Sequence, residues 1–258
     1  MTRTRAGTLL GAQLACGAGL LTLWEVLART GLVDTFFFSR PSAILAGLLH
    51  AVARGTVYAA VAVTLFEASV GFTAGSLLGI ALGILLARHA FVRELLDPFI
   101  YFFYSLPRIA VAPLFIVLLG LGVRSKVATV VFAVFFILLI NTINGVLNIR
   151  PELVRSARIM GATSWQVTIK VVVPAVLSWI FAGLRLSVSM AFLSAVVAEF
   201  VGSTAGLGYQ LHMASTYFDT TGVFVWMVVL GLLSVTLNVT IGWLERRVLR
   251  WRPPVALT

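Results

Sequence analysis

Long runs of apolar residues, separated by short polar or basic segments, dominate this chain. A run of about 20 apolar residues is long enough to cross the hydrocarbon core of a bilayer as a helix. Such runs predict six membrane-spanning helices, near 8–28, 57–87, 99–120, 127–148, 177–200 and 222–244. The second run is unusually long, so we expect that helix to tilt or to project from the bilayer. The pattern therefore predicts an all-α, polytopic membrane protein with six transmembrane helices.

Two segments near the N-terminus need a separate interpretation. The stretch 41–53 is short and amphipathic, which favours a helix on the membrane surface over a span. Basic residues followed by an apolar run that reaches Cys16 faintly resemble a lipoprotein signal, but Gln13 does not fit the position three residues before the cysteine. The run continues to about Leu27, so we expect a retained first span.

A mildly polar segment interrupts the apolar runs between 150 and 185. Pro151 suits the first turn of a helix, and Gly161 can adopt the left-handed conformation that ends one, so we expect a short helix over 151–160. Thr163 and Gln166 form a T-x-x-Q capping box at the start of a second helix, and Pro174 marks its end or a kink. This helix-turn-helix resembles a docking element, not a span.

Each of the two short helices presents one apolar stripe that needs to be buried. The first stripe consists of Leu153, Ala157 and Met160, and the second of Trp165, Ile169 and Val172.

Composition confirms the membrane class and excludes several others. The chain has 258 residues, is 60% hydrophobic and only 11% charged, and has a mean hydropathy of +1.05. A soluble core of this size could not bury so much apolar surface. The net charge of +10 comes from short clusters without an aromatic-interleaved basic face, which argues against nucleic-acid binding. One cysteine and three scattered histidines offer neither a disulfide nor a metal site.

The distribution of Lys and Arg predicts the orientation. With the N-terminus inside, twelve of these residues fall in cytoplasmic segments and five outside, which supports two cytoplasmic termini and a cytoplasmic 150–176 segment. The five external residues are Arg29, Arg40, Arg54, Arg124 and Lys126.

Ionisable side chains within apolar runs are candidate sites, because burying a charge in a bilayer is costly. Glu67 either lines a translocation path or pairs with a cation such as Arg108. Arg108 itself can recognise an anionic solute, snorkel to the interface or hold a helix break. Arg185, near the inner start of its span, is expected to face headgroups.

Other polar and small residues also suggest helix contacts. Asn141, Asn144 and Asn148 share one helix face and either line a polar conduit or form hydrogen bonds between helices. Glu199 lies near the outer end of its span, either at an external gate or at the interface. The glycines at 71, 75, 79 and 83 form a G-x-x-x-G stripe, which indicates packing within the subunit or, alternatively, dimerisation.

The 150–176 segment resembles the signature loop of binding-protein-dependent ABC transporter permeases. That pattern is E-A-A, three residues, G, nine residues and I-x-L-P; here it reads Arg155-Ser156-Ala157, Gly161 and Val171 to Pro174 at the same spacing. Arg155 and Ser156 depart from the pattern, and Glu152 one turn earlier can supply the acidic contact. The resemblance implies an ATPase-coupling loop that comprises Glu152, Arg155, Ser156, Ala157, Gly161, Ala162, Thr163, Ser164, Trp165, Gln166 and Pro174.

Further matches in order along the chain resemble the nitrate, sulfonate, taurine and vitamin-precursor branch of these permeases. They include Leu106-Pro107, Pro113 to Phe115, Gly120 to Gly122, Ser125-Lys126, Phe135-Phe136, Asn141-Thr142, Ala198 to Phe200, Gly206 to Tyr209, and Leu244 to Arg252. The resemblance implies a homodimeric permease of the prokaryotic inner membrane, with an ATPase dimer at its cytoplasmic loops and an external solute-binding protein. Among the solutes of this branch, the contexts of Glu67 and Glu199 slightly favour a pyrimidine or riboflavin-type precursor.

The chain is divided into a first span with an external amphipathic segment over 1–55, a five-span core over 56–250 and a tail over 251–258. No G-x-x-x-x-G-K-[ST] loop is present in the sequence, so ATP and Mg²⁺ are expected on a separate ATPase and no cofactor on this chain. The candidate translocation path consists of Glu67, Arg108, Asn141, Asn144 and Glu199. The alternatives are an ion-coupled secondary transporter or channel that uses Glu67, and a membrane enzyme, for which the sequence offers no nucleophile and base cluster.

Overall fold

The structure, a computed structural model, describes residues 3–248, and the predicted tail 251–258 lies outside these residues. Helices are the only regular elements in the described part. They are α1 (Arg3–Arg29), α2 (Thr35–Phe38), α3 (Pro41–Ala53), α4 (Thr56–Arg88), α5 (Ala90–Ser105), α6 (Arg108–Leu119), α7 (Val123–Leu147), α8 (Pro151–Ile159), α9 (Ser164–Val167), the π-helical turn η1 (Thr168–Val172), α10 (Val173–Val201), α11 (Leu207–Thr216) and α12 (Thr220–Val248).

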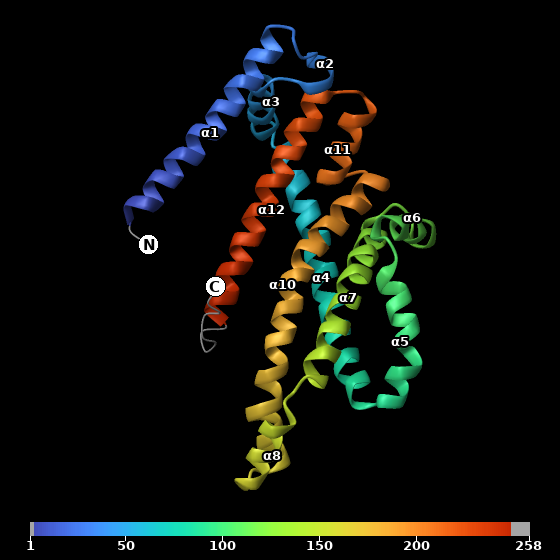
Figure 1. Ribbon diagram of the computed structural model, residues 1–258. Coiled ribbons are helices and arrows are strands. Elements are labelled where there is room, and N and C mark those ends of the chain that lie inside the picture. Colours follow the sequence, from blue (N-terminus) through green and yellow to red (C-terminus); the bar gives the residue numbers. More distant parts are fainter. Residues whose placement is uncertain (1–2, 249–258) are drawn as a thin grey trace.

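The long helices run alternately up and down between two ends of the molecule, which we call the α8 end and the α11 end (Figure 1). Helices α1, α5 and α10 run toward the α11 end, where α2, α3 and α6 also lie, and α4, α7 and α12 run back. Five described helices are long and apolar enough to cross a membrane, and the bent pair α5–α6 makes a sixth candidate. The six-span prediction is therefore confirmed, and the expected surface segment is the helix α3.

The third predicted span is not one straight helix over 99–120. Helices α5 and α6 meet at an angle of 98°. The break falls at Leu106, whose ψ of 132° is extended, and at Pro107. The ring of a proline disfavours the helical conformation of the preceding residue, which explains the position of this break.

The helix that begins after the 150–162 segment continues into the membrane and does not end at Pro174. Residues Ser164–Val201 form one helical run, and Pro174 lies in the first turn of α10. Just before it, the π-helical turn η1 brings the N–H of Val173 to the carbonyl of Thr168. Such a turn changes the backbone register where proline lacks an N–H and crowds the preceding carbonyls, so the helix can continue.

A stripe of four glycines holds α4 against α7. A Cβ atom at Gly79 would lie 2.6 Å from the backbone oxygen of Phe135, and Gly71, Gly75 and Gly83 also approach α7 closely. The absence of side chains on this face allows the two backbones to approach closely. The stripe therefore packs within the subunit, and its alternative interpretation as a dimer interface is wrong. At 33 residues, α4 is about 50 Å long, well beyond a hydrocarbon core of about 30 Å.

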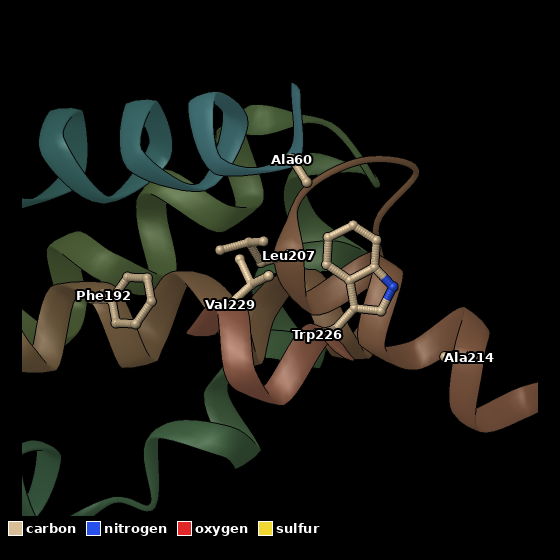
Figure 2. Packing of buried hydrophobic residues seen from close by; sticks show 6 residues of the cluster. All are labelled: Ala60, Phe192, Leu207, Ala214, Trp226 and Val229. Carbon is tan, nitrogen blue, oxygen red and sulfur yellow. The ribbon is translucent and has the colours of Figure 1, made fainter. Parts of the chain in front are cut away.

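A cluster of buried apolar residues packs α11 against the spans. Figure 2 shows its six buried residues, which come from α4, α10, α11 and α12: Ala60, Phe192, Leu207, Ala214, Trp226 and Val229. Helix α11 is too short to cross the membrane, and burial of Leu207 at its first position anchors it to the α11 end of the bundle.

Candidate coupling loop and buried polar cluster

The first half of the 150–176 loop has the predicted helix with its predicted end. Helix α8 stops before Gly161, whose φ is +82°. The N–H of Gly161 donates to the carbonyl of Arg158, and the N–H of Ala162 donates to that of Ala157, both at 3.0 Å. These two bonds form a Schellman motif, which satisfies carbonyls that the helix end would otherwise leave open.

The predicted capping box at the start of the second helix is confirmed. The N–H of Thr163 donates to Gln166 Oε1 at 2.9 Å, and the N–H of Gln166 donates to Thr163 Oγ1 at 3.3 Å. Val167, one residue further, is buried. The turn between α8 and α9 is therefore fixed by backbone and side-chain bonds on both sides, so the loop is a built structure with a defined shape.

The apolar side chains of this loop remain largely uncovered by the chain itself. Trp165 is 71% exposed and Met160 is 86% exposed, and Leu153 and Ile159 are exposed as well. The predicted apolar stripes thus exist, but the structure does not bury them. The other candidate loop residues Glu152, Arg155, Ser156, Ser164 and Pro174 are exposed, and Ala157 and Ala162 are half-buried.

The loop surface is also basic. Arg150, Arg155, Arg158 and Lys170 are exposed around the single acidic residue Glu152. Exposed apolar anchors within a charged rim are typical of a surface that binds another protein.

A buried polar cluster joins α4, α7 and α10 toward the α11 end. Glu67, Lys126 and Glu199 are each at most 3% exposed. Lys126 Nζ lies 3.6 Å from Glu67 Oε1 and donates a hydrogen bond to the carbonyl of Leu121 at 3.2 Å. The sequence pattern places Lys126 outside the membrane among the external cations, but the structure buries it as the partner of Glu67. The side chain of Arg108, the other proposed partner, lies outside the described residues.

Glu199 binds the start of α11. Its Oε2 accepts a hydrogen bond of 2.7 Å from the N–H of Gly208, and the N–H of Leu207 donates to Thr64 Oγ1 at 2.9 Å. A carboxylate at a helix N-terminus compensates the partial positive charge of the free N–H groups. A Cβ atom at Gly206 would lie 2.2 Å from Glu199 Cδ, so only glycine fits at that position. The sequence places Glu199 beside this loop but does not predict its burial.

The carboxyl groups of Glu67 and Glu199 are neighbours, and the ammonium group of Lys126 pairs with Glu67. Both oxygens of Glu67 and Oε1 of Glu199 are buried. None of the three side chains lines the two grooves described below. The cluster therefore links four helices electrostatically.

The asparagine row on α7 bonds mainly to its own helix. Asn141 Nδ2 donates to the carbonyl of Ile137 and Asn148 Nδ2 to that of Asn144, both at 2.8 Å. Asn141 and Asn144 are half-buried, and Gly183 of α10 packs against Asn141. Within the described residues, these amides form no hydrogen bond to another helix. The structure therefore does not support the interpretation that the asparagines form hydrogen bonds between helices.

Two grooves open between the spans. One, of about 470 Å³, lies between α4, α10 and α12, and Arg185 contributes to its lining. The other, of about 640 Å³, lies between α5, α6 and α7 and is lined by phenylalanines and Arg124. The sequence does not predict this second groove, because its rings come from helices whose mutual angle depends on the break at Leu106.

Comparison with known proteins agrees with the helical membrane fold and the exposed loop described above. The family described as binding-protein-dependent transport system inner membrane component matches residues 75–250. The chain is 31% identical over 97% of its length to an aliphatic sulfonates transport permease protein, SsuC, of Bacillus subtilis, of which 90% is covered. It is 34% identical over 90% of its length to the riboflavin transport system permease protein RibX of Chloroflexus aurantiacus, of which 87% is covered.

The fold is also similar to that of solved ABC transporter structures. An inward-facing structure of the MetNI methionine ABC transporter matches with a TM-score of 0.63, at 21% identity, over 75% of this chain and 94% of that chain. The expected family resemblance and the all-helical permease fold are thus confirmed. The chain belongs to the family of binding-protein-dependent transport system inner membrane components, and it is a multi-pass permease subunit of an ABC importer, not an enzyme.

Proposed function

We propose that two copies of this chain form the membrane-spanning part of an importer and that the 150–176 loop of each copy binds a cytoplasmic ATPase. ATP and Mg²⁺ bind to that ATPase, and this chain binds no cofactor. An extracytoplasmic binding protein delivers the solute to the α11 end. The observation that carries the proposal is the exposure of Trp165 and Met160 on a loop whose turn is fixed by hydrogen bonds.

The mechanical part of the proposal depends on the continuity between loop and span. Trp165 lies in α9, and the helical run Ser164–Val201 continues from there through the bundle to Glu199. A displacement of the loop by the closing ATPase would therefore move α10 as one element, and Glu199 would carry that movement to α11. A rigid helix with two attachment points can transmit such a movement, whereas a flexible linker cannot.

The arrangement of the ends supports cytoplasmic termini. The N-terminal end of α1 and the C-terminal end of α12 both point toward the α8 end (Figure 1). If the basic loop around α8 faces the cytoplasm, as the excess of Lys and Arg favours, the described ends of the chain face it too. We propose the inner membrane of a prokaryote as the location.

The solute is proposed to be small and polar. The two relatives described above are named for aliphatic sulfonates and for riboflavin, and nitrate, taurine and pyrimidine-type vitamin precursors fit the same branch. The alternative of an ion-coupled secondary transporter or channel needs a coupling carboxylate that ions can reach. Glu67 is buried and paired with Lys126, which disfavours that alternative.

Cross-linking from the loop tests the proposed ATPase contact. Cys16 is the only cysteine, so a Cys16→Ser chain provides a background without thiols. In this background, Trp165→Cys should cross-link to a protein that carries a G-x-x-x-x-G-K-[ST] loop, whereas Tyr217→Cys, which is similarly exposed at the end of α11, should not. Equal cross-linking from both positions, or none from the loop, would refute the coupling assignment.

A further inference from the structure

The groove between α5, α6 and α7 has an unusual lining. Five phenylalanines contribute to it: Phe103 from α5, Phe115 from α6, and Phe132, Phe135 and Phe136 from α7. Four of these side chains are half-buried and Phe103 is exposed, so their rings remain partly accessible. The volume of about 640 Å³ falls in the usual range for sites that bind small organic molecules.

The five rings form one connected network. Phe136 lies at its centre, with ring centroids 4.8 Å from Phe135, 5.1 Å from Phe132 and 6.1 Å from Phe103. Phe132 extends the network to Phe115 at 6.2 Å. The rings of Phe103 and Phe136 are nearly parallel, and the other pairs are tilted or edge-on. Both ring faces and ring edges are therefore available to a flat guest.

Arg124 is the one polar side chain among the described residues that line this groove. It lies in the first turn of α7, near the α11 end, and is exposed. A guanidinium group binds carboxylate, sulfonate or phosphate through two parallel bonds and also stacks on flat rings. The groove thus combines a large aromatic surface with one cation at its edge.

We infer that this groove binds a planar heteroaromatic solute that carries an anionic group, with the rings of the solute against the phenylalanines and its anion on Arg124. This inference rests on the proposed function, because it names the solute class that the importer carries. A small anion without a ring, such as ethanesulfonate, would meet only Arg124 and would leave the aromatic surface unused. The observed lining therefore favours flat ring systems over aliphatic sulfonates.

The position of the groove fits passage of a solute. It lies beside the bend between α5 and α6, because Phe103 and Phe115 from these helices line it. Arg124 belongs to the first turn of α7, and α7 begins at the α11 end, from which a binding protein would deliver its cargo. An anion would therefore meet the cation before its rings reach Phe132 and Phe136. The two occupants that compete with a solute are a lipid chain and a second copy of this chain.

Flavin fluorescence tests the inference directly. The purified importer in lipid nanodiscs is titrated into riboflavin, which has the ring system without a strong anion, and into flavin mononucleotide, which adds a phosphate. We expect saturable quenching of both, with flavin mononucleotide bound about tenfold more tightly, and no competition by taurine.

Variants assign the binding to this groove. Phe132→Ala, and Phe132→Leu as the variant that keeps more of the volume, should weaken both flavins about fivefold to tenfold. Arg124→Gln should remove the preference for flavin mononucleotide and leave riboflavin nearly unchanged. Phe91→Ala is the control, since Phe91 is an exposed α5 ring that does not line the groove, and it should change neither affinity.

Several results would overturn the inference. These are quenching that does not saturate, flavin affinities that are unchanged in Phe132→Leu, and a phospholipid retained by the native protein but released by Phe132→Leu. Efficient disulfide formation between two Phe132→Cys copies in the Cys16→Ser background would assign the groove to a subunit interface instead. If the ATPase still binds while flavins do not, only this inference fails; if the ATPase does not bind, the proposed function fails with it.

Discussion

Lys126 Nζ lies 3.6 Å from Glu67 Oε1, and both side chains are almost completely buried. This pair joins α7 to α4, and the neighbouring Glu199 joins α10 to the first turn of α11 through Gly208. The α11 end of the bundle is thus held by ionisable side chains that are buried in the described structure. Its stability should depend on their balance.

Removal of the buried cation should be strongly destabilising. Lys126→Met leaves Glu67 without its partner, and breaking a buried pair from one side costs about 3–5 kcal/mol. The double variant with Glu67→Gln should recover much of that loss, because it removes the stranded charge. Each variant is solubilised in a mild detergent and unfolded with a chemical denaturant, and circular dichroism monitors the unfolding. The curves give the free energy of unfolding of each variant.

The control for this prediction is an ion pair with one exposed partner. Glu94 lies 3.7 Å from Arg93 and its side chain is 71% exposed, so Glu94→Gln should cost less than about 1 kcal/mol. A Lys126→Met chain as stable as Glu94→Gln would contradict the account of the buried cluster.

Gly206 should tolerate no side chain, because its space is taken by a carboxylate. Gly206→Ala combines a φ of +103° with a Cβ position 2.2 Å from Glu199 Cδ, and together we expect a cost of about 3–4 kcal/mol. Gly120 has a φ of +83° but nothing within 4 Å of its Cβ position. Gly120→Ala should therefore cost only the backbone strain, about 1–3 kcal/mol, and the melting temperatures of the purified variants will compare the two changes.

A glycine of the stripe and a glycine outside it should respond to alanine with opposite changes in stability. Gly79→Ala should destabilise the chain, since its Cβ would press on the backbone of α7 at Phe135. Gly19→Ala in α1 has open space around it and should be neutral or stabilising by up to about 1 kcal/mol, because alanine favours a helix more than glycine does. Unfolding curves in which both changes have the same effect would argue against the close contact of α4 with α7.

The sequence predicts those features that depend on local chemistry. The lengths of the apolar runs predict the spans. Gly161 predicts the end of α8, and Thr163 with Gln166 predicts the cap of α9, because each of these two features depends on residues within about one turn. The sequence contains Pro107 but does not predict the break there, because the packing around a proline decides whether the helix bends or continues. At Pro174 the helix continues, because the π-helical turn accommodates the proline.

Features formed by distant segments escape sequence reasoning. Lys126 reads as an external cation because it follows a short loop, and only the packing of α4 on α7 makes it the partner of Glu67. The aromatic groove likewise requires the 98° angle between α5 and α6, which brings Phe103 and Phe115 to the rings of α7. Composition records these phenylalanines but cannot assign them to one site.

Trp165 should matter for coupling and little for stability. Its side chain is 71% exposed, so Trp165→Ala removes few contacts within the chain, whereas an aromatic anchor at a protein interface contributes about 2 kcal/mol or more. We expect binding of the ATPase to weaken at least about 30-fold, with an unchanged melting temperature. Tyr217→Ala, an equally exposed aromatic change near the opposite end, should leave ATPase binding intact; comparable loss in both variants would contradict a specific anchor.

The most direct test of the central claim is gentle affinity purification of the tagged chain from its own membranes, with the stoichiometry of every protein that accompanies it. The account predicts one ATPase with a G-x-x-x-x-G-K-[ST] loop for each copy of this chain, in an assembly with two copies of each. Recovery of a stably folded chain without any ATPase would contradict coupling through the 150–176 loop and would favour ion-driven transport through Glu67.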